Sequence, residues 1–401
     1  MTTRLKINVA AENVGSDLTN FAISVRLNAD ILTTAELAAL VSTPQQVMFY
    51  NEAETTELYA ELEYANSEEV RYWVTVPTLS SSSDTVVWLD ILTGTANTSH
   101  IGYSTYGIVQ TYVWPSISNV WHLSQDPSGG TYCLTNSADS YHGTPGGSMT
   151  SDDLINTDYG PAISFDGSDD YFNCGALSQT LSLATFFGLM KLSSAQSYYA
   201  GWVSDNQNGV RMTHEGNKYP LLYTGADTPF NSTNANWSAY AGTWATYAIT
   251  FTSTESKFYI NGVLVDTITY SSRSMAMTHF YWFRNTYDSS FLSADARDIV
   301  LDFSAWSADH VAAFSKNVLN TLATIARNVY LSGTVRDQSN TPISGATVKA
   351  FNASDELSYS TLTTSSGAWT IDYILDGTYD IVAEYSGYQS DIVNGVTPEE
   401  A

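Results

Sequence analysis

The first chemistry to test is glycoside hydrolysis, because two carboxyl groups about 5 to 5.5 Å apart can cleave a glycosidic bond. Glu61 and Glu63 alternate as such a pair would on one strand, with Glu57, Glu68 and Glu69 close by. No feature of this stretch predicts that any of these acids is buried, and burial is what raises the pKa of a catalytic acid. We therefore expect a solvated acidic face and a protein that is not an enzyme.

The histidines do not have the spacing of a metal site. No HxH or HExxH pair occurs, and Lys218 follows His214 and Glu215 where a helical zinc site would need its second histidine. The chain also lacks a GxSxG elbow, a phosphate-binding loop and a dinucleotide fingerprint. We expect surface or hydrogen-bonded roles for the other five, which are His100, His122, His142, His279 and His310.

Calcium is the ion that this sequence favours, because hard cations take oxygen ligands that cluster in loops. Asp166, Asp169 and Asp170 form such a cluster, with Asp152 and Asp153 upstream. The same residues also suit an ordinary turn at the entry to a strand. We assign no metal or other cofactor here, and these three aspartates are the calcium candidates.

Aromatic side chains that stack on sugar rings are the remaining candidate chemistry. Five of them stand beside Gly, Asn or Ser in loop-rich stretches, namely Trp202, Trp237, Tyr281, Trp282 and Tyr287. Large aromatic residues also fill cores and interface rims, so core packing is the alternative interpretation. A glycan-binding surface built from these five residues is the prediction.

Charge excludes several classes of partner. The 401 residues contain 41 Asp and Glu against 15 Lys and Arg, giving a net charge of −26, and no Lys or Arg lies between Arg71 and Lys191. Nucleic-acid binding depends on cations that release counterions, and anionic membranes repel acidic proteins. Since no apolar run approaches the length of a membrane span, we expect neither nucleic-acid binding nor membrane insertion.

Two further features concern the cellular compartment. Cys133 and Cys174 lack the spacing of a zinc or redox site, so two small buried thiols and one disulfide remain the alternatives. The first residues include no apolar segment of signal-peptide length, which predicts a protein that is not exported through such a peptide.

Short strands separated by turns account for most of the chain. Residues 21–27 alternate apolar and polar side chains, and similar strands are expected at residues 69–76, 84–92, 246–252 and 256–264. Asn261-Gly262 predicts a tight hairpin between two antiparallel strands, because both residues tolerate positive φ angles. Many short strands at such intervals are typical of β-sandwiches.

One segment has the period of a helix. In residues 307–328 the apolar positions Val311, Phe314, Val318, Leu322 and Ile325 follow 3-4-4-3 spacing. The residue before Ala308 is a serine placed to cap the first turn. The helix could lie on a sandwich or bridge two domains, or it could form a short coiled-coil seam in a homo-oligomer.

Three stretches carry family resemblances. Residues 16–28 (SDLTNFAISVRLN), 47–66 and 70–91 resemble an uncharacterised β module found ahead of concanavalin-A-like domains in bacterial surface and phage virion proteins. Where that family tends to have a Tyr-Gly-Asn turn, this chain has Ile91-Leu92-Thr93-Gly94. The family has no assigned activity, so the resemblance implies a fold and a context only.

The second and third resemblances cover the rest of the chain. VWHL (residues 120–123), AISFDGSDDYFNCG (162–175), TWATYAITFTSTESKFYINGVLV (243–265) and ARDIVLDFSAWSADHVAAF (296–314) are similar to laminin-G-like, concanavalin-A-like jelly rolls. SGTVRDQSNTPISGATVKAF (332–351) and the stretch 363–388 are similar to the carboxypeptidase-regulatory-like, Ig-like fold. An add-on domain of this last kind implies no chemistry.

The predicted fold class is all-β, with three consecutive β-sandwiches and one short helix before the last. The expected segments are an N-terminal β module (residues 1–96), a linker (97–118), a jelly roll (119–306), the helix (307–328), an Ig-like domain (329–395) and a tail (396–401).

The function that these features favour is a bacteriophage virion structural protein, such as a spike, fibre, tail or capsid-decoration component. It would contact other virion proteins and a host-surface glycan, as a homo-oligomer on the particle surface. The alternative is a bacterial extracellular lectin-like adhesin, and a polysaccharide-active enzyme ranks last for want of a suitable carboxylate pair.

Overall fold

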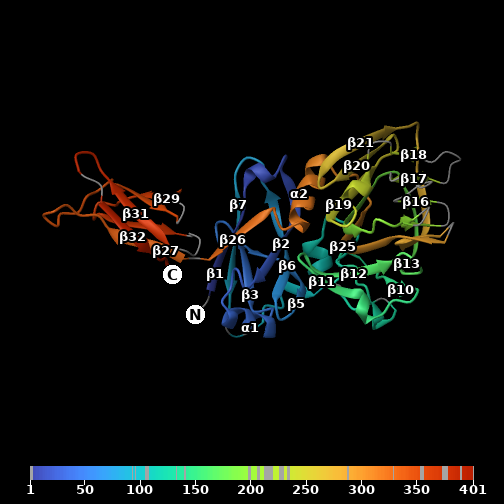
Figure 1. Ribbon diagram of the computed structural model, residues 1–401, viewed down its shortest axis with the longest axis horizontal. Coiled ribbons are helices and arrows are strands. Elements are labelled where there is room, and N and C mark those ends of the chain that lie inside the picture. The colour runs from blue at the N-terminus through green and yellow to red at the C-terminus, as the bar shows by residue number, and fades with distance from the viewer. Residues whose placement is uncertain are drawn as a thin grey trace.

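The computed structural model describes residues 3–92, 94, 96–103, 108–131, 133–139, 141–196, 200–205, 208–211, 220–224, 230–232, 235–286, 289–327, 329–352, 356–372, 378–388 and 391–400. The chain is almost entirely β-structure and forms three sandwiches in series (Figure 1). This arrangement confirms the all-β prediction. None of the helices in the described ranges is long and apolar enough to cross a membrane.

The N-terminal sandwich packs two antiparallel-rich sheets in the orders β26-β1-β7-β3-β4 and β2-β6-β5-β8. Its elements are β1 (Thr3–Val9), β2 (Leu18–Asn28), α1 (Thr34–Ser42), β3 (Val47–Asn51), β4 (Glu57–Leu58), β5 (Ala60–Ala65), β6 (Glu69–Leu79), β7 (Thr85–Ile91) and β8 (Ile101–Tyr103). The predicted alternation at residues 21–27 falls within β2, where Val25 and Leu27 are buried and Arg26 is half-buried.

The segment 97–118 does not behave as a free linker. β8 pairs in parallel with β5, and a π-helical turn follows at Val109–Val113. Thr75 donates to the carbonyl of Val113 at 2.7 Å, and Trp114 is only 2% exposed. These contacts make the segment part of the N-terminal sandwich, which its Gly, Ser and Thr content did not indicate.

The central sandwich is the largest. One sheet has the order β10-β13-β22-β15-β16-β17-β18, and the other has the order β11-β12-β25-β14-β19-β20-β21, with β9 paired to β25. The strands are β9 (Val120–Trp121), β10 (Thr144–Gly146), β11 (Leu154–Thr157), β12 (Gly160–Asp166), β13 (Tyr171–Leu181), β14 (Ala184–Leu192), β15 (Gly201–Ser204), β16 (Asn208–Arg211), β17 (Leu221–Thr224), β18 (Phe230–Asn231), β19 (Trp244–Phe251), β20 (Glu255–Ile260), β21 (Val263–Thr269), β22 (Met275–Trp282) and β25 (Ser293–Asp302).

The predicted hairpin lies at the edge of this second sheet. Asn261 and Gly262 have φ angles of 49° and 77°, and Ile260 pairs with Val263 across the turn. Positive φ at both positions is what a two-residue turn needs to match the twist of its strands. A second small hairpin, β23 (Arg284–Asn285) with β24 (Ser290–Phe291), follows β22.

The predicted helix is shorter than expected. α2 spans Ala308–Val318, and the Ser307 hydroxyl accepts a hydrogen bond from the backbone N–H of His310 at 3.1 Å as its cap. Asn320 has a φ of 57°, a left-handed conformation that ends helices. The prediction of helix to residue 328 is therefore wrong: β26 (Ala323–Arg327) is a strand that pairs with β1.

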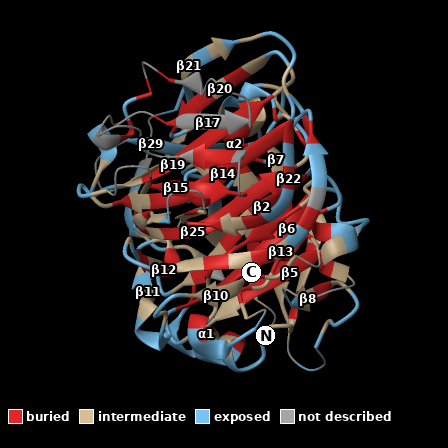
Figure 2. Cartoon of the chain, turned by 90° about the vertical axis from the view of Figure 1, so that its right-hand side faces the viewer, coloured by how far each residue is buried: buried red, intermediate tan, exposed pale blue. Residues whose placement is uncertain are grey.

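One hydrophobic cluster spans the N-terminal sandwich and one face of the central sandwich, while the interior of the central sandwich forms a second cluster. The cluster that contains Ile23 and Trp73 of the N-terminal sandwich also contains Phe187 and Val300 of the central sandwich, with Phe314 of α2 between them. α2 lies at the junction of the two sandwiches (Figure 1), and Figure 2 shows buried residues concentrated on the strands. The helix therefore bridges two domains, which was one of the arrangements predicted from the sequence.

The C-terminal sandwich has its own small core. Its sheets have the orders β30-β27-β33 and β29-β28-β31-β32, from β27 (Val329–Thr334), β28 (Thr347–Phe351), β29 (Leu357–Leu362), β30 (Ala368–Asp372), β31 (Tyr379–Glu384), β32 (Asp391–Val396) and β33 (Glu399–Glu400). Val348, Trp369 and Ile381 belong to a core cluster separate from the other two. The domain stands to one side of the N-terminal sandwich in Figure 1.

Candidate functional site

Three of the five predicted glycan-binding aromatics lie in the core of the central sandwich. Trp202, Trp237 and Trp282 are 0%, 1% and 0% exposed. The Trp202 ring lies 6.0 Å from that of Trp237 and 6.1 Å from that of Trp282, between centroids. No sugar can stack on rings enclosed in this way, so the core-packing interpretation holds for these three. Tyr287 lies outside the described residues.

Tyr281 belongs to a half-buried cluster on the other face of the same sheet. It precedes buried Trp282 on β22, and neighbouring residues of a strand point to opposite faces. Tyr281 is half-buried beside Tyr171 of β13, with 6.0 Å between ring centroids, and Phe291 lies 6.2 Å from Tyr171. These three rings and Arg284 form what we call the aromatic–arginine patch.

Arg284 occupies the centre of this patch. Its Cζ atom lies 4.8 Å from the Tyr171 ring centroid, 5.7 Å from that of Tyr281 and 5.6 Å from that of Phe291. No carboxylate among the described residues pairs with it, and its buried Nε has no hydrogen-bond acceptor there. An arginine held by aromatic faces keeps its charge and offers donors to a polar ligand, while the rings offer apolar faces to a sugar.

The calcium candidates come together in one turn. Asp166 ends β12, Asp169 and Asp170 lead into β13, and one carboxylate oxygen from each lies within 4.8 Å of the others. Burial raises the pKa of Asp170 to about 6, and the charges of Asp166, Asp153 and Asp169 act in the same direction. Asp166 differs: although burial raises its pKa, hydrogen bonds from the N–H groups of Ser168 and Asp169 lower it overall.

The Glu61–Glu63 pair is buried, which corrects the prediction of a solvated acidic face. Both side chains lie at the interface of the N-terminal and central sandwiches, with no exposed side-chain surface. Glu69 is also buried and pairs with Arg26. Glu61 and Glu63 alternate along β5 and so point to the same face of the strand, which is buried. The positive charges that balance their negative charges come mainly from distant parts of the chain.

Arg297 and Asp298 of β25 meet Glu63 in this interface. Arg297 Nη2 lies 2.8 Å from Glu63 Oε1, and its Nε lies 2.8 Å from Asp298 Oδ2. Neighbours on a regular strand would point apart, but Asp298 has a φ of 49° where the pairing of β25 with β14 shifts register. This bulge turns both side chains toward the same cluster.

His122 and Arg71 complete the buried ionic cluster, defined as Glu61, Glu63, Asp298, Arg71, Arg297 and His122. His122 Nδ1 lies 2.8 Å from Asp298 Oδ1, and its Nε2 lies 3.3 Å from Glu61 Oε2. Arg71 Nε lies 3.3 Å from Glu63 Oε2. Three carboxylates face two guanidinium groups, so a protonated His122 brings the formal charge to zero.

The environment of His122 favours that charged form. Burial lowers the pKa of His122, but the charges of Glu63 and Glu61 and the hydrogen bond to Asp298 outweigh it and raise the pKa to about 10. Burial likewise disfavours ionised Asp298, but Arg297 and Arg71 hold its pKa well below the ordinary range. Two tryptophan indole groups donate hydrogen bonds to the glutamates. Trp114 Nε1 is 2.6 Å from Glu61 Oε2, and Trp73 Nε1 is 2.7 Å from Glu63 Oε2.

Comparison with protein families agrees with this architecture. A model of the concanavalin A-like lectin/glucanases superfamily matches residues 166–312. This chain contains a concanavalin A-like domain. A model of the carboxypeptidase regulatory-like domain matches residues 330–401. The central and C-terminal sandwiches therefore have the folds that their motifs predicted, while the resemblance of the N-terminal module remains a prediction.

Solved structures resemble the chain only distantly. The fourth domain of an extracellular arabinanase from Geobacillus stearothermophilus, in complex with arabinotriose, has 13% identity and a TM-score of 0.41, covering 50% of this chain and 98% of that one. The receptor-binding domain of a botulinum neurotoxin C/D mosaic serotype has 12% identity and a TM-score of 0.37, covering 69% and 73%. A carbohydrate-binding module of a Ruminococcus gnavus sialidase, bound to sialyllactose, has 14% identity and a TM-score of 0.31, covering 38% and 96%. No curated protein matches the sequence.

The remaining predicted residues of the concanavalin A-like domain are structural. Cys174 is buried and Cys133 half-buried, and both are free thiols. His310 stacks on Trp306 with 4.2 Å between centroids, and burial lowers its pKa to about 4. His142 accepts a hydrogen bond from the Asn136 N–H at 2.9 Å. His214 lies outside the described residues.

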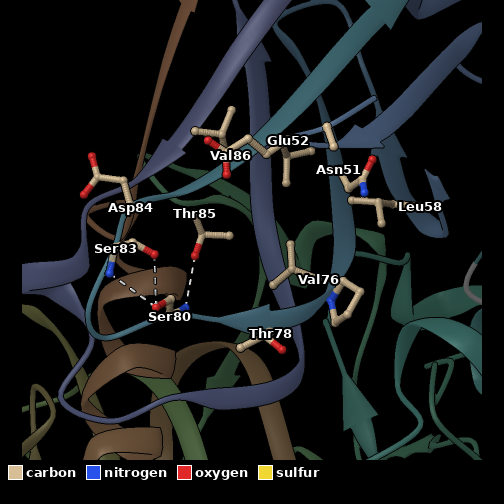
Figure 3. A pocket seen from close by; sticks show the side chains of 13 residues that line it. Asn51, Glu52, Leu58, Val76, Thr78, Ser80, Ser83, Asp84, Thr85 and Val86 are labelled. Carbon is tan, nitrogen blue, oxygen red and sulfur yellow. Dashed lines mark hydrogen bonds between the residues drawn. The ribbon is translucent and has the colours of Figure 1, made fainter. Parts of the chain in front are cut away.

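A groove of about 470 Å³ opens on the N-terminal sandwich (Figure 3). Leu58, Val76 and Val86 form part of its wall, with hydroxyl groups of residues such as Ser80 and Thr85 along the rim. Asp84 at its edge already accepts hydrogen bonds from Asn8 and the Ala11 N–H. Glu52 and Asp84 are the two acidic residues in the lining of this groove.

The sequence named one member of the aromatic–arginine patch and missed three. Tyr171, Arg284 and Phe291 come from β13, β23 and β24, and only the pairing of β13 with β22 and of β23 with β24 brings them to Tyr281. One sequence feature could have pointed to them: Arg284 is one of only 15 cations in the whole chain and is flanked by aromatic residues.

Proposed function

We propose that this protein is a non-enzymatic adhesin whose concanavalin A-like domain binds carbohydrate through the aromatic–arginine patch. The observation that carries the proposal is Arg284, held between the rings of Tyr171, Tyr281 and Phe291 without a carboxylate partner among the described residues. Aromatic faces suit the apolar faces of sugar rings, and a guanidinium group donates to hydroxyl or carboxylate oxygens.

The patch also changes the expected ligand class. A net charge of −26 disfavours binding of acidic glycans through salt bridges over most of the protein surface. Arg284 supplies one local cation, so both neutral and carboxylate-bearing sugars fit the patch. The two other sandwiches would then hold the concanavalin A-like domain away from the surface on which the protein is mounted.

The test is a glycan array probed with the full chain, followed by titration of the best ligands. We expect binding that is lost in Tyr281→Ala and in Arg284→Ala. Tyr103→Ala is the matched control, because Tyr103 is 53% exposed on the N-terminal sandwich, away from the patch. Equal binding by all three variants would contradict the proposed site, and no binding by the wild type to any glycan would contradict the function.

We place this adhesin on a bacteriophage particle as a spike, fibre, tail or capsid-decoration protein, in contact with other virion proteins and as a homo-oligomer. The acidic, sandwich-built chain suits display at high copy, because mutual repulsion limits aggregation. Mass spectrometry of purified particles should detect the protein, and its consistent absence would overturn this placement. Gene neighbours devoted to secretion would favour the alternative, a bacterial extracellular adhesin.

A further inference from the structure

We propose that the C-terminal sandwich binds a second copy of this chain through the outer face of its sheet β29-β28-β31-β32, so that two chains form a two-fold symmetric dimer. The proposal rests on the homo-oligomer of the proposed function and names the surface that forms it. It does not depend on carbohydrate binding, which is assigned to the central sandwich.

The pairing of the strands fixes which side chains point out of this sheet. Ala350 of β28 and Ile381 of β31 are paired, and both belong to the core of the domain. Side chains alternate along a strand, so the neighbouring pair, Lys349 and Val382, points away from the core. The same outward row continues onto β29 and β32, which are the two edge strands of the sheet.

The outward face is largely apolar. By the same register Val382 shares it with Phe351, Leu357, Leu362 and Ile392. Leu357, Leu362 and Ile392 are 54%, 63% and 57% exposed, and Phe351 and Val382 are half-buried. Single exposed apolar residues are ordinary on a protein surface, but a contiguous apolar face indicates an interaction surface.

The opposite sheet of the same domain has a polar outer face. Leu331 of β27 and Ile371 of β30 are paired and buried. The next pair, Ser332 with Thr370, points outward and is exposed, as is Thr334. Alternation of apolar residues inside and polar residues outside is the usual pattern of an antiparallel sheet with one solvated face. The apolar outer face is therefore a property of one sheet and not of the domain as a whole.

No described part of this chain covers the apolar face. The C-terminal sandwich stands to one side of the N-terminal sandwich (Figure 1), and the high exposure of Leu357 and Leu362 shows that their side chains reach solvent. Two sheets can pack face to face about 10 Å apart, with the side chains of both faces interdigitating. The outer face is thus available for contact with a second sheet.

Charge favours a second copy as the partner. Residues 329–401 contain ten Asp and Glu but only two cations, Arg336 and Lys349. Lys349 lies within the apolar face, with its Nζ 2.7 Å from Glu384 Oε2, and Asp380 points outward from the same strand as Glu384. Because the face carries both signs of charge on adjacent strands, a two-fold rotation can bring Lys349 of each copy toward an acid of the other. Contacts elsewhere on this acidic domain would place like charges together.

Sedimentation velocity of the full chain over a range of concentrations tests the interface. We expect wild type to form a reversible dimer. Leu362→Glu and Leu357→Glu should each raise the dimer dissociation constant by about tenfold or more, because each would place a carboxylate in an apolar contact. Val263→Glu is the matched control, since Val263 is 64% exposed on β21 of the central sandwich and should leave the dissociation constant unchanged.

Thermal melts and glycan titration on the same proteins distinguish loss of the interface from other effects. Leu362→Glu should melt as wild type does, because the side chain is exposed, and it should bind a soluble monovalent glycan as wild type does. A wild type that stays monomeric up to about 0.1 mM would overturn both the homo-oligomer and this interface. An oligomer that Leu362→Glu and Leu357→Glu leave intact would overturn the interface alone. Failure of wild type to bind any glycan would overturn the adhesin and leave the interface standing.

Discussion

Arg297 of the concanavalin A-like domain reaches into the N-terminal sandwich and lies 2.8 Å from Glu63, Nη2 to Oε1, with both side chains completely buried. The pair joins two domains that are 234 residues apart in sequence at this point. Together with the shared hydrophobic cluster around Phe314, it makes the two sandwiches a single unit. A mutation at the junction should therefore destabilise both domains at once.

Replacing Glu63 with Gln should destabilise this unit by about 3–5 kcal/mol, because it leaves buried guanidinium groups without their counter-charge. The measurement is urea unfolding of the full chain, followed by tryptophan fluorescence. Glu54→Gln is the control: Glu54 pairs with Arg4 at the surface, where ion pairs contribute about 0–1 kcal/mol. Similar losses in the two variants would contradict the cluster's role.

His122 should be an imidazolium ion at pH 8. Its pKa is raised from the ordinary 6.5 to about 10, so the folded state holds a proton that the unfolded state releases. The stabilisation is therefore complete below about pH 6.5 and is lost as pH rises through about 10. Long-range ¹H–¹⁵N NMR should show protons on both ring nitrogens at pH 8, and a neutral tautomer there would contradict the charge balance.

The His122 contribution can also be separated from other titrations by unfolding experiments. His310 has a pKa lowered to about 4 by burial, so it opposes folding only as pH falls below about 6.5. The two histidines thus act in different pH ranges. Between pH 7 and pH 10 wild type should lose stability, whereas His122→Gln should lose less across the same interval.

Two truncations should separate the contribution of β26 to stability from that of the C-terminal domain. A chain that ends at residue 328 keeps β26 paired with β1 and keeps Arg327 bonded to Glu36 at 2.9 Å, so its N-terminal unit should melt like that of the full chain. A chain that ends at residue 322 loses both and should melt several degrees lower. Differential scanning calorimetry measures this, and equal melting of the two truncations would show that β26 contributes nothing.

Substitutions of Trp282 and Tyr281 should separate effects on stability from effects on carbohydrate binding. Trp282→Ala removes a fully buried indole and should cost about 3–5 kcal/mol of unfolding free energy. Tyr281→Ala alters a half-buried side chain on the opposite face and should cost much less, while abolishing carbohydrate binding. Urea unfolding and glycan titration on the same samples provide the measurement. A large stability loss in Tyr281→Ala would mean that it is a core residue.

Local rules predicted most of the architecture. The Asn261-Gly262 hairpin, the cap at Ser307 and the alternation within β2 depend on neighbouring residues only, so they could be identified without coordinates. The sequence prediction extended the helix too far, because Leu322 and Ile325 continue the helical spacing beyond the end of α2 at Val318. Pairing with β1, more than 300 residues earlier, made residues 323–327 a strand instead.

The sequence by itself determined the all-β class, the order of the sandwiches and the acidic turn at Asp166, since alternation, turn residues and composition are local properties. Only the tertiary structure decided that Glu61 and Glu63 are buried and that Tyr281, not Trp282, faces outward beside Arg284. The reason is physical: whether a charge can be buried or a ring exposed depends on partners such as Arg297 and Tyr171, which strand pairing and a bulge bring from distant parts of the chain.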